Sequence, residues 1–275
     1  MRLLDLFNGF LIDMDGVVYL GEIPIEGSPD TIMHLKNNRK SVLFLTNDPR
    51  KSSSEYADKL RNIGIEANSQ DVITSAMAIA HHISGKYNKL ADMTAYAIGS
   101  NALKKQIKET GLKIVVGEEA KKADFVILGG HPDFHYNEMK LATLAIRNGA
   151  HFYATNRDPA YPSDEGHVPA TGAMLASIEV ASGKEAIVAG KPENIIFDVA
   201  LVEHGLEDRE GLVMIGDRLD TDILGGNNAG MSTILVLSGS TKKEDLRDSE
   251  IKPDYVINDL RDLLKDIPTK LKKYS

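Results

Sequence analysis

Two aspartates follow an apolar run close to the start of the chain. In the segment FLIDMDG, Asp13 and Asp15 stand one residue apart, directly after Phe10, Leu11 and Ile12. Such runs form buried strands, and a buried strand rarely ends in two like charges unless another group neutralises them. Three more apolar runs end in polar side chains: VLFL precedes Thr46, Asn47 and Asp48, IVAG precedes Lys191, and LVMIG precedes Asp217, with Asp220 and Asp222 close behind.

These residue types suit the transfer of a phosphoryl group. Several carboxylates placed close together repel one another unless a divalent cation lies among them, and oxygen ligands suit Mg²⁺. A lysine, a threonine hydroxyl and main-chain N–H groups supply the charge and the donors that phosphate oxygens need. Asp13 could then attack phosphorus, because the cation and Lys191 neutralise the phosphate that would otherwise repel it. Asp15 could protonate the leaving oxygen and later deprotonate a water molecule.

For these side chains to meet, the strands that carry them need to be neighbours in one sheet. Short apolar runs alternate with longer amphipathic segments, a pattern typical of parallel sheets built from βαβ units. In an open parallel sheet, the carboxyl ends of the strands form the ligand crevice. The predicted strands are Gly9–Ile12, Ser41–Leu45, Ala186–Ala189, Gly211–Ile215, Thr233–Leu237 and Asp254–Ile257.

The middle of the chain has its own alternation of predicted strands and helices. A helix is predicted from about Ser75, after which strands and helices alternate through AYAIG, NALKKQIKETG, DFVILGG, NEMKLATLAIRNG and HFYATN. This block indicates a second α/β unit inserted into the first, although no Gly/Ser linker marks the joins. We expect a discontinuous catalytic core over residues 1–74 and 184–275, and an inserted α/β domain over residues 75–183.

The composition narrows the classes of function. A formal net charge of −8 offers no basic surface for nucleic acid and none for an anionic membrane. The absence of cysteine excludes disulfides, thiol nucleophiles and cysteine-based zinc sites. The N-terminal segment MRLLDLFNGF is interrupted too early by polar residues for a signal peptide, and no segment is apolar for long enough to span a bilayer. We therefore expect a cytoplasmic protein with small-molecule substrates.

The motifs DMDGVVY, LTN, GKP and GDRLDTD, in this order, resemble the four motifs of the haloacid dehalogenase-like phosphatases. Along nearly the whole chain the sequence is similar to the NagD-like, or 4-nitrophenylphosphatase, branch, and the segment ATNRDPAYPSDEGHVPATG resembles the cap signature of that branch. The resemblance implies a Rossmann-like, doubly wound parallel-sheet core with an inserted C2-type cap that selects the substrate. It also makes a homodimer plausible.

The resemblance also implies a role for each motif residue. Asp13 would be the nucleophile and a metal ligand, and Asp15 the general acid and base, with its main-chain carbonyl also on the metal. Thr46 and Asn47 would hold the phosphoryl group, and Lys191 would neutralise it.

The fourth motif would complete the magnesium site. Asp217 would be a direct ligand of Mg²⁺, and Asp222 would support the ion through water or through the residues that bind it, whereas Asp220 is expected to be solvated. Two departures from the branch bear on substrate preference. Asp48 stands in the phosphate-binding loop where a second asparagine is usual, and Ala170 replaces a more usual glycine of the cap signature.

In the inserted domain, Asn156 and Asp158 are the candidates for contact with the substrate, although a structural turn would use the same residue types. The segment GGHPDFH brings His131 and His135 together with Asp133. Pro132 and two glycines disfavour a regular helix there, so the pattern favours a loop that contacts substrate over a metal site.

Two classes of function follow from these residues. The preferred one is a Mg²⁺-dependent phosphatase that acts on small phosphorylated metabolites through an aspartyl-phosphate, with sugar phosphates, phosphoglycolate, nucleotides and aryl phosphates as possible substrates. A phosphotransferase or mutase would use the same site with an acceptor other than water. The alternative from another class is a non-catalytic protein that binds phosphorylated metabolites, which the full set of competent residues disfavours.

Overall fold

The computed structural model describes residues 1–163, 165–206 and 208–266 of the chain. The chain forms two compact units. The first unit consists of residues 1–46, 53–73 and 191–275, and the second of residues 47–52 and 74–190. Within the described part of the chain, none of the helices combines the length and the hydropathy that a membrane span requires.

The first unit is built on a six-stranded sheet. Its order is β15 (Tyr255–Ile257), β14 (Ser232–Val236), β13 (Leu212–Gly216), β1 (Gly9–Asp13), β4 (Ser41–Thr46) and β5 (Val72–Thr74). The pairs from β15 to β4 are parallel. Counted along the chain, this is the 3-2-1-4-5-6 order of a doubly wound fold, in which the chain changes direction across the sheet between β1 and β13. The central strands are apolar on both faces because helices cover both sides, and Phe10, Leu11 and Ile12 are fully buried.

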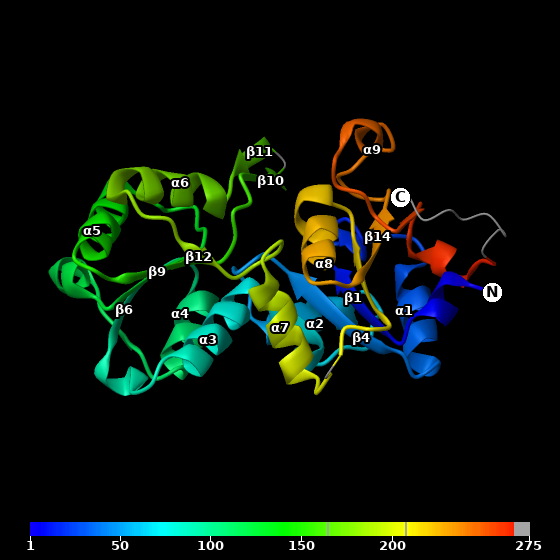
Figure 1. The fold of residues 1–275 in the computed structure, drawn as a ribbon, viewed down its shortest axis with the longest axis horizontal. Coiled ribbons are helices and arrows are strands. Elements are labelled where there is room, and N and C mark those ends of the chain that lie inside the picture. Colours follow the sequence, from blue (N-terminus) through cyan, green and yellow to red (C-terminus); the bar gives the residue numbers. More distant parts are fainter. Residues whose placement is uncertain (164, 207, 267–275) are drawn as a thin grey trace. The chain divides into compact units, whose positions relative to one another are not determined.

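Helices and short turns surround this sheet (Figure 1). The α-helices of the first unit are α1 (Ser28–Asn37), α2 (Ser53–Asn62), α7 (Asn194–Glu203), α8 (Leu224–Asn228) and α9 (Asp245–Asp248). A small hairpin, β2 (Tyr19–Leu20) with β3 (Ile23–Pro24), follows β1. The remaining turns are η1 (Leu3–Leu6), η2 (Ser69–Asp71), η5 (Leu219–Ile223) and η6 (Leu260–Leu264).

The second unit contains a five-stranded parallel sheet. Its order is β12 (Ile187–Val188), β9 (His151–Ala154), β8 (Phe125–Leu128), β6 (Thr94–Ile98) and β7 (Lys113–Ile114). Figure 1 shows α3 (Ser75–Lys86) and α4 (Asn101–Glu109) on one face, and α5 (Tyr136–Arg147) and α6 (Thr171–Ser182) on the other. An antiparallel hairpin, β10 (Ala160–Ser163) with β11 (Gly166–Pro169), and the turns η3 (Leu90–Asp92) and η4 (Gly117–Lys122) complete the unit.

The predicted fold class is confirmed, since parallel sheets alternate with helices in both units. The prediction that residues 186–189 form a strand of the first sheet is wrong. Only Ile187 and Val188 are extended in a ladder, and they pair with Tyr153 and Ala154 at the edge of the second sheet. A short apolar run indicates a strand but not the strand with which it pairs. The partner depends on where the chain lies after the preceding helix, α6, ends.

Candidate active site

Four charged side chains meet in the first unit. The Nζ atom of Lys191 lies 2.5 Å from Oδ1 of Asp13 and 2.7 Å from Oδ1 of Asp222. One oxygen from each of Asp13, Asp217 and Asp222 lies within 4.8 Å of the other two. Lys191, Asp217 and Asp222 are at most 3% exposed. The structure thus brings together four residues that the sequence predicted for the site, although they lie up to 209 residues apart in the chain.

The charges of this cluster do not balance, because three carboxylates surround one ammonium group. Burial raises the pKa of Asp13 well above its usual value; Lys191 opposes the shift, and the Asp222 and Asp217 charges add to it. Burial, followed by the charge of Asp222, raises the pKa of Asp217 to about 6. Burial by itself would lower the pKa of Lys191, but Asp13 and Asp222 outweigh it and raise that pKa. When all four groups are ionised, the cluster holds two negative charges in excess.

Neighbouring strands position the first two carboxylates. Asp13 ends β1 and Asp217 directly follows β13, and these strands pair in parallel register with Ile12 opposite Ile215. They flank the point where the strand order reverses, which is where doubly wound sheets bind their ligands. Asp222 is carried by η5, a single π-helical turn. Such turns are frequent at functional sites.

Gly16 allows the loop after β1 to approach Asp217 closely. Its φ of +85° favours glycine, and a Cβ atom added there would lie 2.5 Å from Oδ2 of Asp217. The loop is also held by main-chain hydrogen bonds, among them Val18 N to Met14 O at 2.8 Å. A larger residue at position 16 would therefore displace either the loop or the carboxylate.

The loop after β14 supports the site and was not predicted. The main-chain N–H of Ser240 donates to Oδ2 of Asp217 at 2.6 Å, and that of Thr241 donates to the Asp217 carbonyl oxygen at 3.1 Å. The Ser238 hydroxyl donates to the carbonyl oxygen of Gly16 at 2.8 Å. The signal was present in the sequence, since small polar residues follow the apolar run TILV as they follow the other strands.

Asp15 and Asp220 have environments unlike those of the buried carboxylates. Asp15 is exposed and lies in the tight loop after β1, where it forms a bridge with Tyr19. Asp220 is 65% exposed, and the guanidinium of Arg218 contacts both of its oxygens at 2.8 and 3.1 Å. Two carboxylates in such different surroundings as Asp13 and Asp15 can perform different chemical tasks at one pH.

The predicted phosphate-binding loop is divided between the two units. Thr46 ends β4 in the first unit and is 8% exposed, whereas Asn47 and Asp48 begin the 47–52 segment of the second unit. The oxygens of Asp48 accept hydrogen bonds from Nε and Nη2 of Arg50, both at 2.8 Å. The additional negative charge that distinguishes this loop is therefore paired with a guanidinium two residues away.

The substrate candidates of the second unit contact Asn47. Nδ2 of Asn47 donates to Oδ2 of Asp158 at 3.1 Å, and Nδ2 of Asn156 donates to the Asn47 carbonyl oxygen at 2.7 Å. Asn156 is 3% exposed, and its Oδ1 accepts from the main-chain N–H of Asp158. Ala170, the departure from the cap signature, directly precedes α6. These contacts give Asn156 and Asp158 a structural role.

The histidines after β8 belong to the start of α5. Nε2 of His131 lies 3.1 Å from Oε2 of Glu138, and Nδ1 of His135 accepts from the main-chain N–H of Glu138. His135 is thus the N-cap of α5. Among the residues that the structure describes, the one group of three or more acidic or histidine side chains close enough to share a metal ion is Asp13, Asp217 and Asp222.

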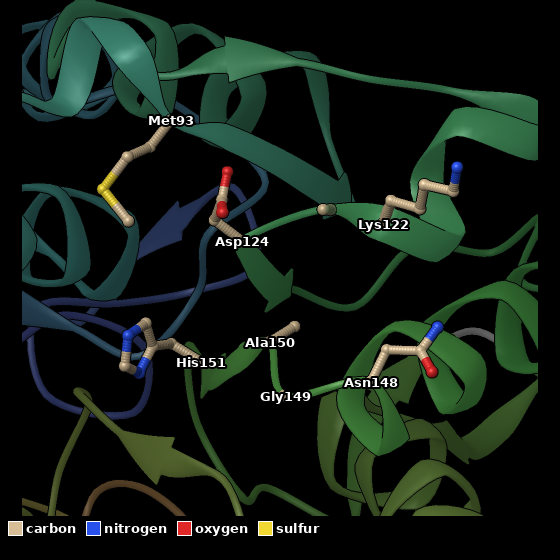
Figure 2. Close-up of a pocket in the computed structure, with 8 residues that line it drawn as sticks. Met93, Lys122, Asp124, Asn148, Gly149, Ala150 and His151 are labelled. Atoms are coloured by element: carbon tan, nitrogen blue, oxygen red, sulfur yellow. The ribbon is translucent and has the colours of Figure 1, made fainter.

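A hollow of about 440 Å³ lies at the amino ends of β6, β8 and β9 in the second unit (Figure 2). Its polar side chains hold the strands together: Oδ2 of Asp124 accepts from the main-chain N–H and the hydroxyl of Thr94 at 2.7 and 2.8 Å. The His151 ring packs against Tyr87 and Phe125. This hollow lies at the opposite end of the sheet from the crevice that ligands of parallel sheets use.

The donor set of the cluster in the first unit fits a divalent cation. It offers hard carboxylate oxygens at short separations, and its excess of two negative charges matches the charge of such an ion. The raised pKa values of Asp13 and Asp217 have the same origin, because each carboxylate is buried beside others with too little positive charge nearby.

Comparison with known proteins identifies the family. The family model described as haloacid dehalogenase-like hydrolase matches residues 10–113, and a second one, described as HAD-hydrolase-like, matches residues 188–263. An acid sugar phosphatase of Staphylococcus haemolyticus is 35% identical over 97% of this chain and 99% of its own. The structure of 4-nitrophenylphosphatase from Thermotoga maritima superposes with a TM-score of 0.88, at 35% identity, and covers 98% of this chain and 100% of its own.

A glycerol phosphate phosphatase from Mycobacterium tuberculosis, whose structure was determined in complex with magnesium, is also similar. Its TM-score is 0.87 at 33% identity, over 96% of this chain and 78% of its own. The chain therefore belongs to the haloacid dehalogenase-like hydrolases and is an enzyme of their phosphatase class.

Proposed function

We propose that this enzyme is a Mg²⁺-dependent phosphatase that hydrolyses small phosphomonoesters through an aspartyl-phosphate on Asp13. The observation that carries the proposal is the buried cluster in which Asp13 contacts Lys191 beside Asp217 and Asp222. A carboxylate that ends a central strand, beside a fixed ammonium group, is placed to meet an anionic phosphoryl group without repelling it.

The first step transfers the phosphoryl group to the enzyme. A carboxylate oxygen of Asp13 forms a bond to phosphorus while the bond from phosphorus to the ester oxygen breaks. The carboxyl group of Asp15 donates its proton to that oxygen, so that the alcohol leaves in its neutral form. Exposure of Asp15 in the loop after β1 suits this role, because its carboxyl group exchanges protons with solvent. Lys191 offsets the negative charge of the phosphoryl oxygens.

The second step returns Asp13 to its starting state. The carboxylate of Asp15 removes a proton from water while the water oxygen bonds to phosphorus, and the bond between phosphorus and Asp13 breaks. Inorganic phosphate leaves, and Asp15 is again protonated for the next turnover. One residue can serve as acid and then as base because the two steps need the opposite protonation state.

We assign the magnesium site to Asp13, Asp217 and Asp222, with the main-chain carbonyl of Asp15 as a further ligand. A bound divalent cation supplies positive charge to the phosphoryl oxygens and to the carboxylates around them. Ser240 and Gly16 keep Asp217 in place for this purpose. Asp222 keeps a contact with Lys191 through Oδ1 and with the Arg218 main-chain N–H through Oδ2, which suits a supporting role.

The substrates that we propose are small phosphorylated metabolites, since the similar proteins are named for sugar phosphates, glycerol phosphate and 4-nitrophenyl phosphate. The selection of substrate by the second unit and the association of two copies of the chain remain predictions of the sequence. A panel of sugar phosphates, glycerol phosphate, phosphoglycolate and nucleoside monophosphates would rank the substrates.

The proposal is tested by phosphate release from 4-nitrophenyl phosphate and from this panel, with Mg²⁺ and with EDTA. Release that needs Mg²⁺ supports the proposal. Acid quenching of enzyme incubated with ³²P-labelled substrate would then trap label on Asp13, and its absence from an Asp13→Asn variant would locate the linkage. If no substrate releases phosphate in a metal-dependent way, the proposed reaction is wrong. Transfer of label to an added alcohol in preference to water would instead indicate a phosphotransferase.

A further inference from the structure

Part of the predicted phosphate loop contacts the second unit beyond the carboxyl ends of β6 and β8. Along the chain, its sheet has the order 2-1-3-4-5, with the reversal between β6 and β8. Sheets with this order bind ligands at the carboxyl ends of the strands beside the reversal. Here Ser100, which follows β6, donates from Oγ to the carbonyl oxygen of Pro49 at 2.7 Å. After β8, the space beside Gly129 is taken by the Pro49 ring, 3.3 Å from where a Cβ atom would lie.

The main chain of Asn47 is fixed at the same end of the unit. Its carbonyl oxygen accepts two hydrogen bonds, from the Ser75 hydroxyl at 2.6 Å and from Nδ2 of Asn156 at 2.7 Å. Ser75 is fully buried and Asn156 is 3% exposed. Buried polar groups of this kind need partners, and the 47–52 segment supplies them.

The side chain of Asn47 is fixed as well. Nδ2 donates to Oδ2 of Asp158, and a carboxylate accepts hydrogen bonds only, so this contact sets which end of the amide faces Asp158. Oδ1 lies beside Gly190, where a Cβ atom would be 2.5 Å away. Asn156 joins the two contacts, because its Oδ1 accepts from the main-chain N–H of Asp158 at 3.0 Å.

We propose that Asp158 and Asn156 are positioning residues of the phosphatase reaction, which hold Asn47 in the orientation in which it donates to the phosphoryl group. The inference depends on the proposed function, in which Asn47 binds phosphate. It assigns the organisation of the phosphate loop to the second unit, because the division between the units falls at the bond between Thr46 and Asn47. Asp158 acts through Asn47 and needs no contact with the substrate.

A double-mutant cycle between Asn47 and Asp158 tests this assignment. The single variants Asn47→Ala and Asp158→Ala and the double variant are compared by kcat, KM and the affinity for inorganic phosphate with Mg²⁺. We expect Asp158→Ala to lower kcat/KM roughly tenfold or more in the wild-type background, as loss of a hydrogen bond to a charged group does. In the Asn47→Ala background the same change should cost less than about twofold, because the residue through which it acts is gone.

Conservative and matched variants separate positioning from general loss of structure. Asp158→Asn keeps an acceptor for Nδ2 of Asn47 and should recover most of the lost activity. Asp92→Ala removes an exposed carboxylate that lies just before β6, and it should leave kcat/KM unchanged. Thermal melts of every variant report whether the fold is retained.

Three outcomes would overturn the assignment: losses that multiply in the double variant, wild-type phosphate affinity in Asn47→Ala, or no recovery in Asp158→Asn. Failure of the proposed function is a separate observation, since wild-type enzyme would then release no phosphate from any substrate. In that event the cycle is still measured from the binding of inorganic phosphate by calorimetry, and an uncoupled cycle there would also overturn the inference.

Discussion

In both units the strands of a parallel sheet end in polar residues, but the two sets of strand ends differ in how the charges and hydrogen bonds of those residues are satisfied. In the first unit, the buried carboxylates of Asp217 and Asp222 and the partly buried one of Asp13 share one ammonium group, and Asp13 and Asp217 have raised pKa values. In the second unit, hydroxyl, amide and carboxylate groups meet the chain's own 47–52 segment in paired hydrogen bonds.

This difference shows how one architecture can yield both a cluster of excess charge and a set of contacts that fix the 47–52 segment. Buried charges in excess are costly, and a cation or an anionic substrate with its cation relieves the cost. Polar groups that already satisfy one another through hydrogen bonds gain little from a ligand. We therefore expect the chemistry at the strand ends with uncompensated charge, whereas the strand ends of the second unit hold the 47–52 segment in place.

The largest effect should follow from removal of the proposed nucleophile, Asp13. We expect Asp13→Asn to lower kcat by about four orders of magnitude or more, because the amide cannot form the covalent intermediate. The variant should still bind inorganic phosphate, since Lys191 remains. Steady-state phosphate release and calorimetry provide the two measurements. Activity near that of wild type would show that the reaction does not proceed through Asp13.

Removal of the ammonium group of Lys191 should lower the free energy of unfolding as well as the rate of phosphate release. Lys191→Met leaves the carboxylates of Asp13 and Asp222 buried without their partner. We expect the free energy of unfolding at pH 7.5 in EDTA to fall by about 3–5 kcal/mol. Urea denaturation gives this value, and Lys243→Met, at an exposed position of the same unit, serves as the control. An equal loss in both variants would mean that the ion pairs in the cluster contribute nothing specific.

The excess charge predicts a pH dependence in the metal-free enzyme. The folded pKa of Asp217, about 6, lies above the ordinary value of 3.8, so the folded state holds this proton more tightly than the unfolded state does. The resulting stabilisation is complete below about pH 4 and is lost as the pH rises through 6. Asp217→Asn carries no such charge, so its stability relative to wild type should improve by roughly 2.5 kcal/mol between pH 4 and pH 7.5.

Denaturation of both proteins in EDTA at the two pH values measures this difference, in which the titration of carboxylates outside the cluster cancels. Mg²⁺ should stabilise wild type more at pH 7.5 than at pH 5, because protons compete with the ion for the carboxylates. A stability difference between the two proteins that does not change with pH would show that Asp217 titrates normally.

The smallest effect is expected at the hydrogen bonds by which the second unit fixes Asn47. Ser75→Ala removes one of two hydrogen bonds to the carbonyl oxygen of Asn47 and leaves the bond from Asn156. We expect the free energy of unfolding to fall by about 1 kcal/mol and kcat/KM to change less than about threefold. A loss of unfolding free energy comparable to that of Lys191→Met would erase the distinction between the strand ends of the two sheets.

Asp13 and Asp217 were predictable as candidate site residues because each follows an apolar run that forms a buried strand, and the end of a parallel strand is where a ligand binds. Lys191 was predicted by the same rule, although the short run before it joins the edge of the second sheet. The supporting loop at Ser238 and Ser240 obeys the same rule and could have been found by applying it to β14. The strand β5, the helix α6 and the hairpin of β10 and β11 were not among the predicted elements.

The sequence by itself determined the types of side chain at the strand ends, and hence the chemistry, because charge and hydrogen-bonding capacity belong to each residue. Tertiary structure decided which of these residues meet. It placed β12 in the second sheet although the strand precedes Lys191, and it assigned Asn47 to a different unit from Thr46. Partners of this kind depend on packing between segments far apart in the chain, which no local pattern of residues records.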